Sequence, residues 1–233
     1  MKNKNYSLSI IIPCLNEISS LNQTINIITK NKVKKEILII ISKKLTNSKT
    51  LNGIKKLKKK YKFIKYFYQD KPFVGGAIEK GIKKSKNSHL ALMAADLETN
   101  PYHLKKLISN SLDHRNLIIV GDRWKKKNNF KNYGFLNLFL NFTAQKFIKF
   151  FVNIPINDFT FAYRIYPKES IKKLKITEYR NGWALEMLLL PYKNNYKFKS
   201  VSTNWTLRKE GNKSNSFINY ISFFKILIYY LIK

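Results

Sequence analysis

The chain has 233 residues, of which 45 are lysine or arginine and 13 are aspartate or glutamate, so its formal net charge is +32. One cysteine excludes an internal disulfide, and three histidines predict no zinc site. Nearly all of the positive charge is lysine, whereas base and phosphate recognition favours arginine, so we expect no nucleic-acid-binding role.

The composition favours one α/β body over several domains. A chain of this length can bury an ample core, and no Pro-, Gly- or Ser-rich linker divides it. Residues 1–6 are polar and basic and precede a short apolar run that ends at Pro13, so the hydrophobic stretch of a signal peptide is missing. We therefore expect a cytoplasmic location.

Apolar runs and amphipathic patterns alternate along the first half of the chain. Strands are predicted over residues 8–12, 36–41, 63–68, 89–93 and 116–120. Helices are predicted between them over residues 17–30, 48–60, 74–85 and 101–109. This alternation specifies a mostly parallel sheet with helices on both faces. Longer helices are predicted afterwards over residues 134–151 and 183–192, with a strand-like run over residues 196–205.

Two carboxylates follow the fourth apolar run directly. Asp96 and Glu98 stand where an open parallel sheet binds ligands, beyond the carboxyl end of a strand. Mg²⁺ or Mn²⁺ takes one or two such carboxylates together with substrate phosphate oxygens. The residues alone leave a simpler alternative open. Thr99 or Asn100 could cap a helix that begins at Pro101, with the acids complementing the helix dipole.

The order of three motifs favours the metal site over the simpler alternative. The first strand ends at Pro13 and passes through Asn16 and Glu17 into a helix, a Gly-rich turn surrounds Gly76, and the acidic segment around Asp96 comes third. Together they resemble the family 2 glycosyltransferases. The resemblance implies a GT-A type of α/β fold and a nucleotide-sugar donor that contacts all five of these residues.

The same resemblance assigns the metal and the closing loop. It implies Mg²⁺ or Mn²⁺ on Asp96, which would be the catalytic metal ligand, with Glu98 as the second ligand. The segment from Arg208 to Asn215 is similar to the family's closing loop, which implies that Arg208 and Lys213 contact the donor diphosphate. Mobile positive charge on such a loop can close over a bound donor.

The second half resembles the dolichol-phosphate mannosyltransferase-like branch of the family. Residues 121–124 and 158–164 look like that branch's motifs, which implies that Arg123 and Arg164 bind the acceptor. Asp158 is the catalytic candidate if a hydroxyl acceptor requires a base. An ion pair between Asp158 and Arg164 that fixes a loop is an equal alternative.

Departures from the family pattern fall in the metal motif and at the position that binds the nucleotide base. Ala94 stands where the first aspartate of the metal motif is usual, and Ile41 and Ser42 stand where many relatives carry an aspartate that binds the nucleotide base. These departures motivate a second hypothesis, in which the chain is a catalytically degenerate relative that binds a nucleotide sugar without turnover.

We expect a metal-dependent, inverting glycosyltransferase that moves a sugar from a nucleotide-sugar donor to a polyprenyl phosphate or another glycan precursor. The predicted organisation is a single domain over residues 1–216, with a donor half over residues 7–122 and an acceptor half over residues 123–216. An apolar C-terminal helix is predicted over residues 217–233.

The C-terminal helix admits several arrangements. At ~1.5 Å per residue its apolar part reaches about 24 Å, which is short of the ~30 Å hydrocarbon core of a bilayer. Residues 217–233 could therefore lie at the inner face of the membrane, where basic neighbours attract anionic lipid. The alternatives are that the helix packs back on the catalytic domain or pairs with a second subunit in a homodimer.

Overall fold

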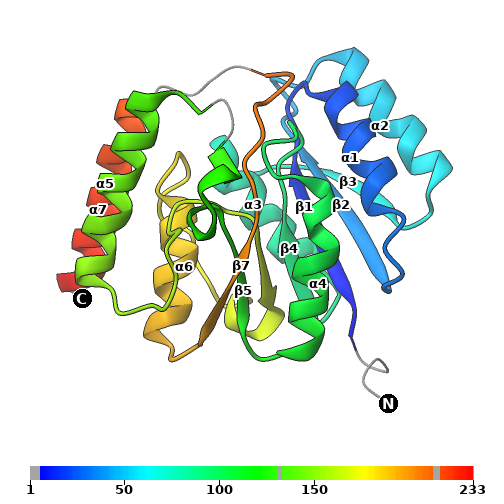
Figure 1. The fold of residues 1–233 in the computed structure, drawn as a ribbon. Coiled ribbons are helices and arrows are strands. Elements are labelled where there is room, and N and C mark those ends of the chain that lie inside the picture. Colours follow the sequence, from blue (N-terminus) through cyan, green and yellow to red (C-terminus); the bar gives the residue numbers. More distant parts are fainter. Residues whose placement is uncertain (1–5, 131–132, 212–215, 233) are drawn as a thin grey trace.

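A computed structural model describes residues 6–130, 133–211 and 216–232 (Figure 1). Strands and helices alternate through its first half: β1 (Leu8–Pro13), α1 (Ile18–Ile28), β2 (Lys35–Ile41), α2 (Ser48–Lys60), β3 (Ile64–Tyr68), α3 (Phe73–Lys84), β4 (His89–Leu92), α4 (Leu104–Asp113) and β5 (Ile118–Asp122). The second half contains longer helices: α5 (Phe135–Phe151), β6 (Arg164–Pro167), α6 (Trp183–Lys193), β7 (Phe198–Ser202) and α7 (Ser216–Ile232). Short 3-10 turns lie at Pro101–His103, Arg123–Lys125, Lys127–Phe130 and Lys168–Ser170.

The strands form one seven-stranded sheet in the order β3-β2-β1-β4-β6-β5-β7. Every neighbouring pair is parallel except those that involve β6, which runs antiparallel to both β4 and β5. The expected α/β class with a mostly parallel sheet is confirmed. The antiparallel strand was not predicted, because β6 has only four residues, begins at an arginine and ends at a proline.

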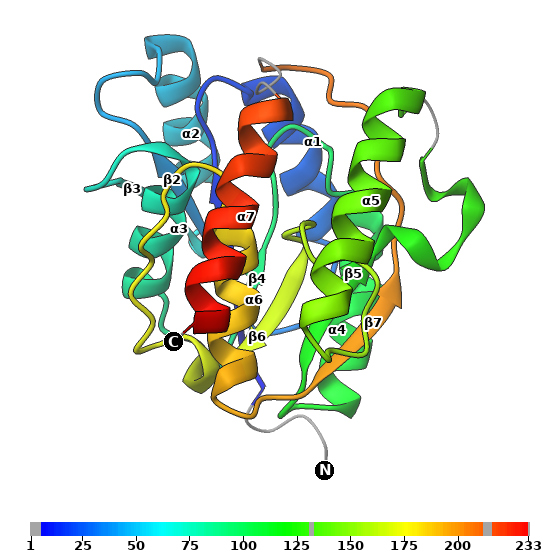
Figure 2. The same cartoon turned by 90° about the vertical axis from the view of Figure 1, so that its left-hand side faces the viewer.

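Both faces of the sheet are covered by helices, as Figures 1 and 2 show. Successive residues of β1 point to opposite faces. Ile10 and Ile12 belong to the core beneath α1, α2 and α4, whereas Ile11 belongs to the core beneath α3 and α6. Full burial of such side chains stabilises the fold by roughly 1.5–3 kcal/mol each. Burial on both faces explains why the strands read as continuous apolar runs.

The helices of the first half begin and pack for local reasons. The Asn47 side chain caps α2 by accepting a hydrogen bond from the backbone N–H of Thr50 at 2.8 Å. Three lysines complete the last turn of α2, where positive charge is favourable to the helix dipole. A Cβ on Gly53 would lie 2.5 Å from Ile18, so this glycine allows α1 and α2 to approach closely.

The glycines of α3 also permit close packing. A Cβ on Gly76 would lie 2.2 Å from the carbonyl oxygen of Lys71. We expect Gly76→Ala to lower the free energy of unfolding by about 1–3 kcal/mol, because the backbone must move to admit the methyl group. Urea unfolding measures this change. Gly134→Ala is the matched control, since a Cβ there meets its nearest atom at 3.7 Å. Equal stability of the two variants would contradict the packing role of Gly76.

The C-terminal helix α7 packs against α5 and α6. Ile226, Leu227 and Tyr230 are buried in the core, and the Tyr230 hydroxyl donates a hydrogen bond to Glu186 at 3.2 Å. The expected alternative in which this helix packs back on the rest of the chain therefore holds for residues 226–230. None of the helices in the described part of the chain has the length and hydropathy required to cross a membrane.

Candidate functional site

Three loops meet where the parallel strands end. The segments after β1, β4 and β5 all leave the same edge of the sheet, at the top of Figure 1. A fourth segment, residues 203–211, crosses this edge and is joined to the loop after β4 by an antiparallel bridge between Thr99 and Trp205. This edge is the expected position for ligands in an open α/β sheet.

The predicted carboxylate pair lies at this edge and faces an arginine. The Arg208 Nε atom is 2.8 Å from Glu98 Oε1, and its Nη2 atom is 3.7 Å from Asp96 Oδ2. The side chains of Asp96, Glu98 and Arg208 are 15%, 26% and 22% exposed, respectively. The structure thus brings together three of the predicted site residues from segments about 110 positions apart, and leaves each of them partly exposed.

A strained turn holds the two carboxylates in place. Leu97, which lies between them, has a φ of 71°, a left-handed conformation that is costly for a leucine. Its carbonyl accepts a hydrogen bond from the Thr206 hydroxyl, and the backbone N–H of Glu98 donates to Asp96 Oδ1 at 3.1 Å. The N–H of Ala94 donates to Thr99 Oγ1 at 2.9 Å. Strain that is supported from several directions is typical of functional sites.

The charge at this turn is only partly neutralised. Burial, followed by the charge of Glu98, raises the pKa of Asp96 to about 6, and Arg208 opposes this shift. Burial also disfavours the charge on Arg208, but the hydrogen bond and charge of Glu98 outweigh it and raise the pKa of Arg208. Two carboxylates that repel each other and share one arginine form a set of hard oxygen donors suited to a divalent cation.

The number of ligands also fits a cation that is shared with a substrate. Within the described residues, no three His, Cys, Asp or Glu side chains gather into a complete metal cluster. Mg²⁺ typically binds through one or two carboxylates and fills its remaining positions with water and phosphate oxygens. Asp96 and Glu98 could therefore hold such an ion, with Ala94 supplying no ligand.

The loop after β1 contacts the crossing segment. Glu17 Oε2 accepts hydrogen bonds from the backbone N–H groups of Leu15 and Asn16 at 2.8 and 3.0 Å. Gly211 has a φ of 86°, and a Cβ there would lie 2.8 Å from Glu17 Oε1, so only glycine fits. Glu210 accepts a hydrogen bond from the N–H of Ser20 at 2.7 Å, in the first turn of α1. These contacts position Arg208 over the edge of the sheet.

Asn16 joins the loops after β1 and β2. Its side chain donates to the carbonyl of Leu45 at 3.2 Å and accepts from the N–H of Asn47 at 2.8 Å. In the second loop, Ser42 Oγ accepts from the N–H of Leu45, so the Ser42 side chain is part of a short turn. Pro13, at the end of β1, pairs with Ile40.

Two other residues, Gly76 and Lys213, are predicted to contact the donor. Gly76 is buried in α3 against the backbone of Lys71, which gives it a packing role, and its contact with a donor stays a prediction. Lys213 lies outside the described residues.

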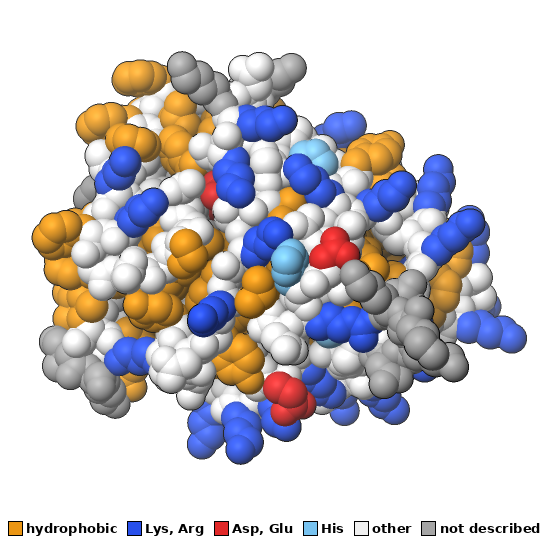
Figure 3. Space-filling view, turned by 60° about the horizontal axis from the view of Figure 1, so that its bottom comes forward, with side chains coloured by type: hydrophobic (Ala, Val, Ile, Leu, Met, Phe, Trp, Pro, Cys, Tyr) orange, Lys and Arg blue, Asp and Glu red, His pale blue; other side chains and the backbone are white. Residues whose placement is uncertain are grey.

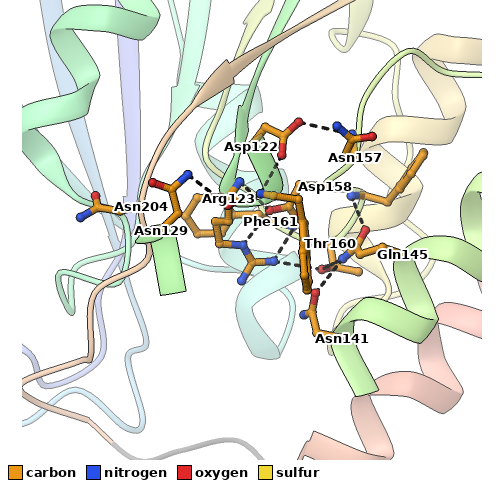
Figure 4. A network of polar contacts seen from close by, with 12 residues as sticks. Asp122, Arg123, Asn129, Asn141, Gln145, Asn157, Asp158, Thr160, Phe161 and Asn204 are labelled. Atoms are coloured by element: carbon orange, nitrogen blue, oxygen red, sulfur yellow. Dashed lines mark hydrogen bonds and ion pairs between the residues drawn. The ribbon is translucent and has the colours of Figure 1, made fainter. Parts of the chain in front are cut away.

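Figure 4 shows a second polar network beyond the end of β5. Arg123 Nε is 2.7 Å from Asp158 Oδ2, and Arg123 Nη2 is 2.9 Å from Asp158 Oδ1, so the pair is bidentate. The N–H groups of Arg123 and Phe161 also donate to this carboxylate. The Arg123 guanidinium lies over the Phe161 ring at 4.5 Å from its centre. Asp158 is fully buried, and Arg123 is nearly so.

This geometry corrects the role expected of Asp158. A general base must reach the proton that it removes. Asp158 has no exposed surface, and both of its oxygens accept hydrogen bonds from Arg123 or from backbone N–H groups. Asp158 therefore forms a structural ion pair, as the alternative expected, but its partner is Arg123 and not Arg164.

Arg164 is also a structural residue, so the acceptor-binding role expected of it is wrong. Its side chain is fully buried in β6. Its Nη1 atom donates to the carbonyl of Ala184 at 2.6 Å, and its Nη2 atom donates to the carbonyl of Phe159 at 2.7 Å. A guanidinium committed to two backbone carbonyls inside the core cannot bind a phosphate at the surface.

Polar residues connect this network to the carboxylate site. The Asn129 side chain donates to the carbonyl of Arg123 at 3.0 Å, and the Asn129 carbonyl accepts from the N–H of Trp205 at 2.9 Å. Burial disfavours the charge on Arg123, but Asp158 and, to a smaller extent, Glu98 raise its pKa.

Sequence reasoning missed three residues that build the site. Thr206 supports the strained turn at Leu97, Glu210 joins the crossing segment to α1, and Asp122 caps the turn after β5 by accepting from the N–H of Trp124 at 2.9 Å. Burial and then Asp158 raise the pKa of Asp122. Polar residues beside each recognised motif were the only available signal, because their partners are distant in the sequence.

Comparisons with known proteins agree with this arrangement. The family model described as "Glycosyl transferase family 2" matches residues 9–175. Among solved structures, glucosyl-3-phosphoglycerate synthase from Mycobacterium tuberculosis with Mn²⁺, UDP-glucose and phosphoglyceric acid superposes with a TM-score of 0.72 at 10% identity, covering 97% of this chain and 80% of that one. The same enzyme with Mg²⁺ and UDP superposes with a TM-score of 0.72 at 12% identity, covering 97% and 79%. The fold is thus of the GT-A type, and the chain belongs to glycosyl transferase family 2.

Proposed function

We propose that this protein transfers a sugar from a nucleotide-sugar donor to a phosphate-bearing acceptor, with the help of a divalent cation. The observation that carries the proposal is the partly exposed group of Asp96, Glu98 and Arg208 at the carboxyl edge of the sheet. In the proposed organisation, residues 7–122 bind the donor and residues 123–216 contribute the acceptor side. The solved relatives with Mn²⁺ and UDP-glucose or with Mg²⁺ and UDP support this choice of donor and ion.

The residues at the carboxyl edge of the sheet would have different roles in the reaction. Asp96 and Glu98 would hold the cation, which as a Lewis acid would stabilise the negative charge that develops on the leaving diphosphate. Arg208 partly neutralises these carboxylates, and a bound cation would release its guanidinium to contact the diphosphate. Pro13, Asn16 and Glu17 would contact the nucleotide from the loop after β1. We propose inversion at the anomeric carbon.

The ion pair of Asp158 with Arg123 favours a phosphate acceptor. A hydroxyl acceptor needs a general base, whereas a phosphate already carries the charge of a nucleophile. Asp158 is paired with Arg123 and is not available as that base. Arg123 is itself paired with Asp158 and nearly fully buried, so its contact with the acceptor phosphate stays a prediction. We propose a polyprenyl phosphate at the inner face of the membrane as this acceptor.

A direct transfer assay tests the proposed function. The purified protein is incubated with Mn²⁺, a panel of nucleotide sugars and either a short-chain polyprenyl phosphate or phosphoglyceric acid, and products are identified by mass spectrometry. We expect a glycosylated phosphate together with a released nucleoside diphosphate. If only phosphoglyceric acid yields a product, the acceptor is a small metabolite and not a lipid. Absence of any product under every combination would contradict the proposed transfer.

Arg208 carries a quantitative prediction about the donor. Arg208→Ala should weaken donor binding by about 1.5–3 kcal/mol, or roughly tenfold to a hundredfold, because a charge-assisted contact to the diphosphate is lost. Isothermal titration calorimetry with the nucleoside diphosphate and Mn²⁺ measures this change. Lys209→Ala is the matched control, since Lys209 is an exposed neighbour on the same segment. If both variants bind the donor as tightly as the unmodified chain, Arg208 does not contact the diphosphate.

A further inference from the structure

Helix α5 exposes an unusual number of large apolar side chains. Phe135 and Phe150, near its two ends, are each 84% exposed. Further side chains along the helix are also exposed: Leu136, Phe139, Phe142, Phe147 and Phe151. A contiguous apolar surface of this kind on a single chain marks an interaction site, because leaving it in water is unfavourable.

Helix α7 extends the same surface. Its buried side faces the core, but Phe224, Ile228 and Leu231 point outward and are exposed. The rings of Phe147 on α5 and Phe224 on α7 are 5.0 Å apart, so the two helices form one continuous face. Figure 2 shows both helices on the same side of the molecule, and Figure 3 shows hydrophobic side chains gathered on that side. We call these exposed residues of α5 and α7 the apolar face.

The charges on the two helices are all of one sign. Neither α5 nor α7 contains an aspartate or glutamate. Lys146 and Lys149 on α5 and Lys225 on α7 are exposed among the aromatic residues. Lysines can bury their methylene chains in an apolar surface while their ammonium groups reach a polar layer above it. A surface with an apolar centre and interspersed lysines is complementary to a bilayer that contains anionic lipid.

A second copy of the chain is a poorer partner for this face. Two copies would bring lysines against lysines without a carboxylate on either helix, and each copy has a net charge of +32. Like charges across an interface oppose association. Anionic headgroups remove this repulsion and attract the basic chain from a distance.

We infer that the apolar face of α5 and α7 docks on the surface of an anionic bilayer, with α5 as the principal contact. The contact is peripheral, since none of the described helices is suited to spanning. The ring of Trp124, next to Arg123, lies 5.5 Å from the ring of Phe142 on α5, so docking brings the proposed acceptor side next to the lipid. The inference goes beyond the proposed transfer reaction, because lipid docking needs neither donor nor acceptor and can be measured without them.

Vesicle sedimentation tests the apolar part of the inference. The full chain is mixed with phosphatidylcholine vesicles with or without about one third phosphatidylglycerol, and the bound fraction is measured. We expect strong binding only to the anionic vesicles. Phe135→Ser with Phe150→Ser should weaken this binding at least about tenfold, because each exposed phenylalanine contributes by its burial in lipid. The matched control is Leu45→Ser with Tyr102→Ser, which removes two exposed apolar side chains that belong to neither α5 nor α7 and should leave binding unchanged.

A second pair of variants tests the charge. Lys146→Gln with Lys225→Gln should weaken binding to anionic vesicles about 25-fold, at roughly fivefold for each lysine near the surface. Lys55→Gln with Lys59→Gln on α2 removes the same charge from an exposed helix elsewhere and should have little effect. Circular dichroism and melting temperature verify that every variant is folded.

Three outcomes would overturn the inference. The first is that the unmodified chain does not bind anionic vesicles. The second is that the variants in α5 and their controls bind equally well. The third is a dimer of the unmodified chain in analytical ultracentrifugation that becomes a monomer in Phe135→Ser with Phe150→Ser, which would assign the face to a second copy. Failure of the transfer assay leaves the docking result unaffected, and the converse also holds.

Discussion

Asp96→Asn is expected to abolish sugar transfer and cation-dependent donor binding while the protein stays folded. The substitution keeps the shape of the side chain but removes the charge that would hold the cation, which is worth several kcal/mol in the transition state. Asp96 lies on a turn at the edge of the sheet, where its side chain is 15% exposed, and an asparagine of the same shape removes no packing. Initial rates and calorimetry with Mn²⁺ measure the two losses.

Two further variants sharpen this prediction. Glu98→Gln should weaken transfer and cation binding less severely, because water can replace part of a second ligand. Asp113→Asn alters an exposed carboxylate at the end of α4 and should change neither quantity. Full transfer activity in Asp96→Asn would show that the cation is not bound at this turn.

Asp158→Asn is expected to destabilise the protein by about 3–5 kcal/mol, the typical effect of breaking a buried ion pair. The substitution leaves the Arg123 guanidinium buried without its counter-charge, although hydrogen bonds to the side-chain oxygen could survive. Equilibrium unfolding in guanidinium chloride measures the difference. The effect arises in the fold and not in the chemistry, so folded Asp158→Asn should keep substantial transfer activity at low temperature.

The control for this prediction is an ion pair at the surface. Asp70→Asn breaks the contact with Lys80 at 2.8 Å, but Asp70 is largely exposed and its loss should change the free energy of unfolding little. Joint replacement of Arg123 and Asp158 by apolar residues of similar size should cost less than Asp158→Asn alone, because no unpaired charge remains. Equal stability of Asp158→Asn and Asp70→Asn would contradict the structural role of Asp158.

The sequence predicts most of the fold because its signals are local. Continuous apolar runs mark the parallel strands, and amphipathic periods mark α1 and α2. Helix α4 begins later than expected, since a 3-10 turn over Pro101–His103, capped by the Asn100 side chain, precedes it. Strand β6 was missed because its four residues carry no alternating pattern, and only pairing with β4 and β5 stabilises it as a strand.

The sequence predicts the position of a site residue only where that residue belongs to a recognisable motif. Asp96 and Glu98 follow a strand end, so their place at the sheet edge could be expected. The pairing of Arg123 with Asp158 could not, because the two are 35 positions apart and Arg164, only six positions from Asp158, was the nearer candidate in sequence. The exposed face of α5 was likewise hidden, since an apolar helix has the same composition whether it lies in a core or faces outward.

The most direct test of a cation-dependent donor site is the melting temperature of the protein with Mn²⁺ and each of several nucleoside diphosphates. A ligand that binds only the native state stabilises it by about 2.7 kcal/mol at roughly 100 times its dissociation constant. We predict that one diphosphate raises the melting temperature only when Mn²⁺ is present, and that Asp96→Asn loses this increase. An unchanged melting temperature with every diphosphate, or an equal increase in Asp96→Asn, would contradict the account.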